Sequence, residues 1–326
     1  MILFDKDIPS NSLVTIIIPT FKRTNELLFN LEHMDSIFKK LNVTIPTLIC
    51  FDGSSKEHIN SIESYCKNSP SPFQLFVNKE NLGLEKTELF LVSKVKTKYA
   101  MLLGEDDYLN EELLKVYFDY LDKKSDEISC IIPNFYGVDE NKKAIRSPKR
   151  RIVKDKLYGS PSLSELYKAN QMSGLLFECD GVYNSYLKCC PHTVYPHLFF
   201  IGFNLLRKKT LEITRHPFMN TYVKTKSFSY TADGLLDEII RIYLCFDCND
   251  NIKKQAVKKL LLRDIRRYCN PSTWRHPRAF FKRVKKNYEN VPKKIKRRIR
   301  LLFALSYFLI PWFVFSHFWV RIFKGF

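Results

Sequence analysis

Short apolar runs alternate with amphipathic segments over residues 13–133 of the chain. Five runs rich in β-branched and aromatic residues predict buried strands, at residues 13–18, 47–51, 73–77, 99–103 and 128–133. Between them, apolar residues recur at helical spacing and predict helices starting with a cap at Thr24 and over about residues 59–65, 84–96 and 110–122. This alternation predicts an α/β fold with a Rossmann-like, mostly parallel sheet and helices on both faces.

The second half of the chain has a less regular pattern. Residues 139–165 are polar and basic, which predicts a surface loop region. Apolar residues return at 172–177 and 198–206, and the spacing predicts helices at 232–247 and 252–268. We expect one α/β domain over residues 1–250, followed by a basic helical region over residues 251–300.

The formal charge of +19 is concentrated near the carboxyl terminus. Residues 1–252 contain 32 basic and 32 acidic side chains, whereas residues 253–300 contain 19 Lys or Arg and only two acids. A nucleic-acid-binding domain usually carries a basic surface on its folded body. The neutral body therefore argues against a nucleic-acid partner.

The last apolar segment has no charged side chain between residues 301 and 320. A helix of this length would extend about 30 Å, the thickness of a bilayer core. Six Lys or Arg residues lie between 293 and 300, and such a cluster favours contact with anionic lipid on the cytoplasmic side. We expect residues 301–323 to associate with the membrane, as a span or as an in-plane helix. A buried core helix is the alternative.

The start of the chain carries acidic residues early and has no positively charged region before an apolar one. This pattern does not predict a secretory signal. We therefore expect a protein on the cytoplasmic side of the cell membrane, attached through its carboxyl-terminal segment.

Polar residues follow the predicted strands. Asp52 comes after the second strand, Asn81 lies in the turn after the third, and Glu105-Asp106-Asp107 follows the fourth. In parallel sheets, ligands bind beyond the carboxyl ends of the strands. Three adjacent acids repel one another unless a cation is bound, which favours Mg²⁺ or Mn²⁺ with oxygen ligands. The alternative is a group of acids that stabilises the start of the following helix.

Two common nucleotide-binding motifs are missing from the sequence. No G-x-G-x-x-G follows the first predicted strand, and G-x-x-x-x-G-K-[ST] does not occur. Neither a dinucleotide site of the Rossmann type nor a P-loop is therefore predicted.

Four motifs at the strand ends have a recognisable order and spacing. They are Val14–Arg23 (Val-Thr-Ile-Ile-Ile-Pro-Thr-Phe-Lys-Arg), Phe51–Ser54 (Phe-Asp-Gly-Ser), Asn78–Gly83 and Tyr99–Asp107. Together they resemble the family 2 glycosyltransferases, whose strand leading into the DxD motif is similar to the last of the four. The resemblance covers residues 12–125 well and residues 170–210 loosely.

The resemblance implies a GT-A fold and the transfer of a sugar from a nucleotide-sugar donor with inversion. The residues that it assigns to the donor are Pro19, Thr20, Arg23, Asp52, Asn81, Gly83 and Asp106. The Mn²⁺ or Mg²⁺ ion would be bound by Asp107 and Glu105. Two positions depart from the family pattern: Phe51 stands where an acid is frequent, and Glu105 has a longer side chain than the usual Asp.

An inverting transfer also needs a general base that takes the proton of the acceptor hydroxyl. His197 lies just before an apolar helix, a position like that of the family's base, and imidazole titrates near neutral pH. Asp180 is the second candidate. For His197, a hydrogen-bonded or capping histidine is the structural alternative.

We therefore expect a metal-dependent inverting glycosyltransferase at the cytoplasmic membrane face. The membrane segment suggests a lipid-linked, glycolipid or polysaccharide acceptor. Two alternatives remain at this point: a nucleotidyltransferase on a related sheet, and a basic protein that binds membranes or nucleic acid without catalysis.

Overall fold

A computed structural model describes residues 2–7, 11–138, 144–146, 155–189, 191–213, 219–222 and 232–268, together with residues 293, 296, 297, 300 and 301. The described residues form two compact units, one from residues 1–162 and 168–228 and the other from residues 163–167 and 229–326. The domain boundaries that the sequence suggests, after residues 250 and 300, stay predictions.

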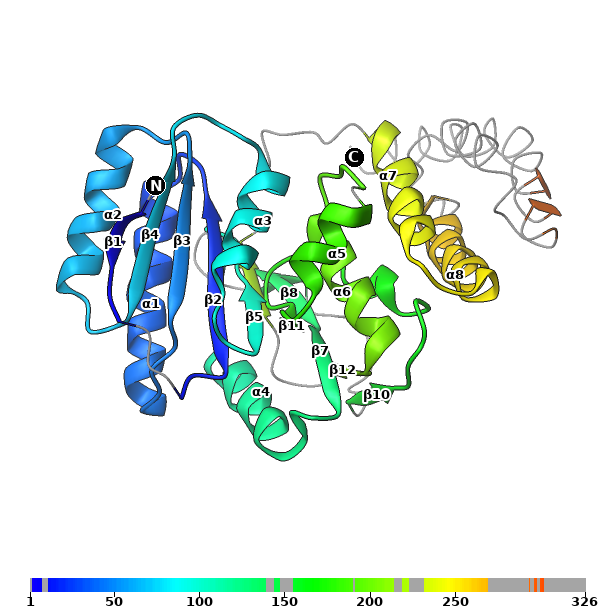
Figure 1. The fold of residues 1–326 in the computed structure, drawn as a ribbon, viewed down its shortest axis with the longest axis horizontal. Coiled ribbons are helices and arrows are strands. Elements are labelled where there is room, and N and C mark those ends of the chain that lie inside the picture. The colour runs from blue at the N-terminus through cyan, green and yellow to red at the C-terminus, as the bar shows by residue number, and fades with distance from the viewer. Residues whose placement is uncertain are drawn as a thin grey trace, which may run out of the picture. The chain divides into compact units, whose positions relative to one another are not determined.

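The first unit is built on a sheet of nine strands (Figure 1). Their spatial order is β1 (Ile2–Asp5), β4 (Phe73–Asn78), β3 (Thr47–Asp52), β2 (Val14–Thr20), β5 (Tyr99–Leu102), β11 (Leu176–Glu178), β7 (Ile128–Pro133), β12 (Lys209–Ile213) and β10 (Lys156–Tyr158). Strands β4, β3, β2 and β5 are parallel neighbours, as the apolar runs predict. The edge strand β1 was not predicted from the sequence.

Strand β11 runs against this direction. It pairs antiparallel with β5 on one side and with β7 on the other. In the register with β5, Glu178 at the end of β11 lies opposite Tyr99 at the beginning of β5. The chain therefore leaves β11 at the edge of the sheet where β5 starts, away from the edge where β5 ends.

The central strands are buried on both faces, which explains their continuous apolar sequence. Ile16 and Ile18 belong to one core cluster with Leu27 and Leu31 of α1 (Thr24–Leu41). Ile17 is fully buried on the other side of the pleat. The remaining helices of this unit are α2 (Lys56–Asn68), α3 (Leu84–Lys94), α4 (Glu111–Lys124), α5 (Val182–Cys189) and α6 (Pro196–Arg207).

The starts of two helices differ in how they are capped. Asn110 caps α4, because its side chain accepts hydrogen bonds from the N–H groups of Glu112 and Leu113. The predicted cap at Thr24 is wrong: Arg23 occupies the N-cap position without a side-chain hydrogen bond. The Thr24 hydroxyl is instead 2.6 Å from a ring nitrogen of His58.

A second, four-stranded sheet lies in the same unit and was not predicted. Its order is β6 (Asp107–Tyr108), β13 (Met219–Tyr222), β8 (Phe135–Val138) and β9 (Ala144–Arg146). These strands are short and join residues more than a hundred positions apart, such as Asp107 and Thr221. The expected loop region 139–165 is described only in part, and it contributes strands to both sheets.

The second unit contains α7 (Ala232–Cys245) and α8 (Asp250–Tyr268), which confirm the two helices predicted from spacing. Among the described residues, no helix is both long enough and apolar enough to cross a bilayer. Of the predicted membrane segment 301–323, all but the first residue lie outside the described residues. Its association with the membrane therefore stays a prediction.

Candidate functional site at the carboxyl ends of the strands

The end of β3 is tied to the loop before α3 by Asp52. One carboxylate oxygen of Asp52 accepts hydrogen bonds from the Leu82 N–H at 2.8 Å and the Asn78 side chain at 3.1 Å. The other oxygen accepts from the Gly83 N–H at 2.9 Å. Asp52 is buried and fixes the shape of the 81–83 loop, while Asn81 is exposed on it.

Gly53 lets this loop approach the turn closely. Its φ angle is +67°, and a Cβ atom there would lie 2.4 Å from the backbone nitrogen of Asn81. Any other residue would have to adopt a rare backbone conformation and displace the loop. The Asp52-Gly53 pair of the sequence motif is thus explained by the structure: Asp52 holds the 81–83 loop, and Gly53 allows it to come close.

Glu105 points into the protein and holds the turn after β2. Its Oε2 accepts hydrogen bonds from the Thr20 hydroxyl at 2.6 Å and the Phe21 N–H at 2.8 Å. Burial raises the pKa of Glu105 to about 7, although these hydrogen bonds and the nearby Arg23 oppose the shift. The sequence suggested Glu105 as a metal ligand; in the structure its Oε2 is engaged by these two donors, and a role toward a metal stays a prediction.

Arg23 bridges the acidic turn from the start of α1. Its guanidinium forms an ion pair with Asp106, and its Nε lies 3.4 Å from Glu105 Oε1. The Arg23 side chain remains 40% exposed. It can therefore contact a bound anion while it offsets the repulsion between the two acids.

Asp107 and Asp106 converge above Gly104. A Cβ atom on Gly104 would lie 3.2 Å from Asp107 Oδ2 and 3.5 Å from Asp106 Oδ1. Asp107 Oδ2 accepts hydrogen bonds from Ser173 and, at 3.2 Å, from Gln171. The segment before β11 therefore orients the Asp107 carboxylate, and the small residue at position 104 leaves both carboxylates room.

These two carboxylates suit a hard divalent cation. Mg²⁺ and Mn²⁺ prefer oxygen ligands, and Mg²⁺ is usually held by one or two carboxylates together with substrate phosphates. Asp106 and Asp107 fit such a site, whereas Oε2 of Glu105 is already engaged in hydrogen bonds with the β2 turn. Within the described residues, no group of three His, Cys, Asp or Glu side chains could hold a metal alone.

A buried histidine that the sequence analysis did not single out completes this network. His58, in the first turn of α2, lies with its two ring nitrogens 3.2 Å from the Thr20 hydroxyl and 2.6 Å from the Thr24 hydroxyl. Burial lowers the pKa of His58. It links α2 to the turn that Glu105 also holds, and its sequence surroundings give no periodic signal for that role.

His197 lies in the first turn of α6 and is buried, with 2% exposure. Its Nδ1 is 3.9 Å from Oε1 of Glu88, a fully buried acid on α3. Burial lowers the pKa of His197 to about 3, and an interaction with the Asn170 backbone partly opposes the shift. Burial also raises the pKa of Glu88. Asn170 lies beside His197, and the next residue, Gln171, contacts Asp107. His197 is therefore connected to the acidic turn through these two consecutive residues.

Asp180 is not brought to this edge. It follows β11, and the antiparallel register places the end of that strand beside the beginning of β5. The Asp180 side chain is 82% exposed and lies 3.1 Å from Arg207 at the end of α6. The structure thus separates the two candidate bases, with His197 and Asp180 near opposite ends of the same helix.

Pro19 and Thr20 end β2 beside β3 and are buried. Together with Arg23, Asp52, Gly83, Asp106 and Asp107 they lie at the edge that the sequence predicted. This grouping follows from parallel pairing, which puts the carboxyl ends of β2, β3 and β5 side by side.

Comparisons with known proteins agree with this geometry. Residues 15–182 match the family described as glycosyl transferase family 2. Abequosyltransferase RfbV of Salmonella typhimurium is 29% identical over 118 residues, which are 36% of this chain and 35% of that protein. The matched part therefore spans about a third of that relative's length.

Solved structures share the fold. The crystal structure of S. aureus TarS 1-349 in complex with UDP-GlcNAc has a TM-score of 0.64 at 14% identity, over 87% of this chain and 83% of that one. Full S. aureus TarS has a TM-score of 0.62 at 13% identity, over 90% and 53% of the two chains. The α/β fold expected from the resemblance is confirmed, apart from the tail outside the described residues. Because the family match covers more than half of the chain, this protein belongs to glycosyl transferase family 2.

Proposed function

We propose that this protein transfers a sugar from a nucleotide-sugar donor to a saccharide or lipid-linked acceptor, with inversion and with the help of a divalent cation. The observation that carries the proposal is the convergence of Asp106 and Asp107 above Gly104, at the carboxyl edge of a family 2 sheet. The family match favours this activity over a nucleotidyltransferase or a non-catalytic basic protein.

The donor's nucleotide would lie along the ends of β2 and β3. The 81–83 loop, held by Asp52, and the β2 turn, held by Glu105, form the two sides of this edge. Arg23 supplies a partly exposed cation beside them. In the S. aureus complexes the bound molecules are UDP and UDP-GlcNAc, so a UDP-sugar is the first donor to test.

Asp106 and Asp107 would hold the Mg²⁺ or Mn²⁺ ion. When bound, such a cation offsets the charge that develops on the leaving nucleoside diphosphate. Ser173 and Gln171 keep the Asp107 carboxylate oriented toward that position. Arg23 pairs with Asp106 and can turn to the diphosphate as the donor binds.

His197 is the candidate general base. The imidazole is neutral near pH 7, but a pKa of about 3 makes it a weak base while it is buried, so its surroundings have to change before it can accept a proton from the acceptor hydroxyl. The ring is buried behind the segment that contains Asn170 and Gln171, so this segment has to move before an acceptor reaches it. Asp180 is less suited, because it lies at the opposite edge of the sheet.

The acceptor is proposed to be presented at the cytoplasmic membrane surface. Helix α8 supports this, because Val257 and Leu260 are buried on one side while Lys254 and Lys258 are exposed on the other. Such a basic face favours anionic lipid. The apolar segment 301–323 would add the hydrophobic attachment.

A donor screen tests the proposal. Purified protein is incubated with UDP-, GDP-, CDP- and dTDP-sugars, with Mn²⁺ or with chelator, and thermal stability and slow donor hydrolysis are measured. One nucleotide class is expected to stabilise the protein and to be hydrolysed only with the cation. If no donor gives a metal-dependent effect in either assay, the proposed activity is wrong.

A further inference from the structure

A pocket lies at the edge of the sheet where β5 begins, opposite to the edge that carries the acidic turn. Its volume is about 460 Å³. Four elements form its wall: the end of α3, the segment 95–98, the end of β11 and the start of α5. We propose that this pocket binds a saccharide unit, through the buried carboxylate of Glu178 and the groups around it.

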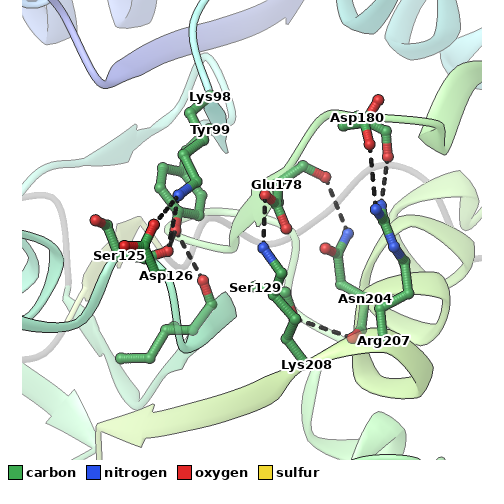
Figure 2. A network of polar contacts seen from close by, with 11 residues as sticks. Lys98, Tyr99, Ser125, Asp126, Ser129, Glu178, Asp180, Asn204, Arg207 and Lys208 are labelled. Atoms are coloured by element: carbon green, nitrogen blue, oxygen red, sulfur yellow. Dashed lines mark hydrogen bonds and ion pairs between the residues drawn. The ribbon is translucent and has the colours of Figure 1, made fainter.

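Glu178 is the main observation behind this proposal. It lines the pocket and is only 7% exposed. Its Oε1 accepts a hydrogen bond from Lys208 Nζ at 3.0 Å, drawn in Figure 2. Its Oε2 is buried and has no hydrogen-bond partner among the described residues. A carboxylate oxygen accepts hydrogen bonds, and a buried unsatisfied acceptor is costly. Because Oε2 is covered in this structure, the Glu178 side chain has to turn toward the pocket before a donor group of a ligand can satisfy it.

The charged groups of the pocket wall are of both signs: two carboxylates, Glu178 and Asp180, stand beside the exposed Lys96. Asp180 adds a second carboxylate, held in place by Arg207 through its side chain and its carbonyl (Figure 2). Lys98 is engaged elsewhere, at 2.9 Å from the Ser125 carbonyl and 3.2 Å from Asp126. The carboxyl end of α3 contributes the negative end of a helix dipole. This combination favours a ligand rich in hydroxyl groups, which can donate to the carboxylates and accept from Lys96.

A saccharide matches these features. Its hydroxyl groups can donate to Glu178 and Asp180, and its apolar ring face can rest on Tyr183 at the start of α5. Asn184 adds an amide that both donates and accepts. The volume lies within the usual range for small-ligand pockets. The choice of a saccharide over other polyols rests on the proposed sugar transfer.

The saccharide unit bound in this pocket would not be the unit that takes part in the proposed sugar transfer. From Lys98 to Gly104 the chain advances six residues, which is about 20 Å of extended backbone. The pocket is therefore separated from the donor edge by the length of β5. It would hold a distant unit of a longer saccharide, or a separate one.

The test measures binding in the absence of any donor. Saturation-transfer NMR on the full chain uses glucose, galactose, mannose, N-acetylglucosamine and lactose as probes. We expect at least one to bind, and Glu178→Gln to weaken it by at least about tenfold, because a charged acceptor becomes a neutral amide. Asn184→Trp, a change at an exposed position of the pocket wall, is expected to block the same probe.

A matched control separates binding from folding. Lys208→Met removes the same ion pair as Glu178→Gln, but Lys208 does not line the pocket, so probe binding is expected to survive. Equal loss in both variants overturns the proposal, as does no binding of any probe to the wild-type protein. Binding of spermidine alone also overturns it, because the site would then select ammonium groups.

A third variant distinguishes this site from the donor edge. Asp107→Ala should leave probe binding unchanged. If Asp107→Ala abolishes binding and Glu178→Gln does not, the saccharide lies at the acidic turn and the proposal is wrong. Failure of the donor screen would leave this binding measurement unaffected, so the two proposals fail separately.

Discussion

The backbone N–H of Gly83 donates a hydrogen bond of 2.9 Å to the Asp52 carboxylate, across 31 positions of sequence. The neighbouring Leu82 N–H binds the other oxygen of the same carboxylate. These bonds join the end of β3 to the loop that precedes α3. In the proposed donor site, Asp52 would therefore act on the nucleotide first through the shape of this loop.

Gly53→Ala tests how closely the two segments must approach. The added Cβ would lie 2.4 Å from Asn81, so we expect a loss of unfolding free energy well above the about 1–2 kcal/mol of the unfavourable φ alone. Gly181→Ala is the control, because Gly181 also has a positive φ (+74°), but the atom nearest to an added Cβ is the end of the Phe203 side chain at 3.4 Å. Urea denaturation measures both, and equal losses would contradict the close approach.

Asp107→Ala is expected to lower kcat by at least about 100-fold, the scale for removing a group that stabilises transition-state charge. The Mn²⁺-dependent part of donor binding should also disappear, while circular dichroism stays unchanged. Glu105→Gln is the control: it should weaken donor binding through the β2 turn but keep the cation dependence. Near-normal turnover of Asp107→Ala would refute the metal assignment.

His197→Ala is expected to lower kcat by about 10²–10⁴-fold, the usual effect of losing a general base. Donor affinity should barely change, because the base acts on the acceptor. Asp180→Asn should leave kcat unchanged, since Asp180 lies at the other edge of the sheet. A fully active His197→Ala enzyme with an inactive Asp180→Asn enzyme would reverse the assignment.

The buried His197 also predicts a pH dependence of stability. Unfolded histidine takes up its proton near pH 6.5, but the folded protein resists this until about pH 3. The contribution of His197 is therefore complete above pH 6.5 and is lost as the pH falls toward 3. Between these two pH values, the free energy of unfolding decreases by up to about 1.4 kcal/mol for each pH unit that the pH falls.

His197→Gln removes this titration, so it should lose less unfolding free energy than the wild type between pH 7 and pH 5. His58, whose pKa is also lowered, is present in both proteins and largely cancels in the comparison. Glu88, whose pKa burial raises, lies 3.9 Å from His197, so any change in its titration is part of the measured difference. Urea denaturation at the two pH values gives the difference. Parallel pH profiles would mean that His197 is not buried as a neutral ring.

Two truncations test the membrane proposal. Removal of residues 293–326 is expected to move the protein from the membrane fraction to the soluble fraction. Removal of residues 302–326 alone keeps the whole basic cluster between 293 and 300. This variant should still bind membranes, but high salt should release it. If the longer truncation stays with membranes after a high-salt wash, the attachment lies elsewhere.

The sequence alone determined the main elements of the fold. The apolar runs predicted at 13–18 and 47–51 correspond to β2 and β3, because hydrophobic periodicity is a local property of the chain. Parallel pairing then placed Asp52 and Asp107 at one edge, since strands separated by crossover helices align their carboxyl ends. The family resemblance was carried by these same local motifs.

Only the tertiary structure decided which groups each of these side chains contacts and at which edge of the sheet it lies. Glu105 turned inward because Thr20 and Phe21, which are distant in sequence, supply its hydrogen bonds. Asp180 went to the far edge because β11 runs antiparallel between β5 and β7, and a strand's direction is not encoded in its own residues. The meeting of Glu88 and His197 likewise depends on two helices packing across more than a hundred positions. Such contacts are fixed only when the whole core assembles, so no local pattern could reveal them.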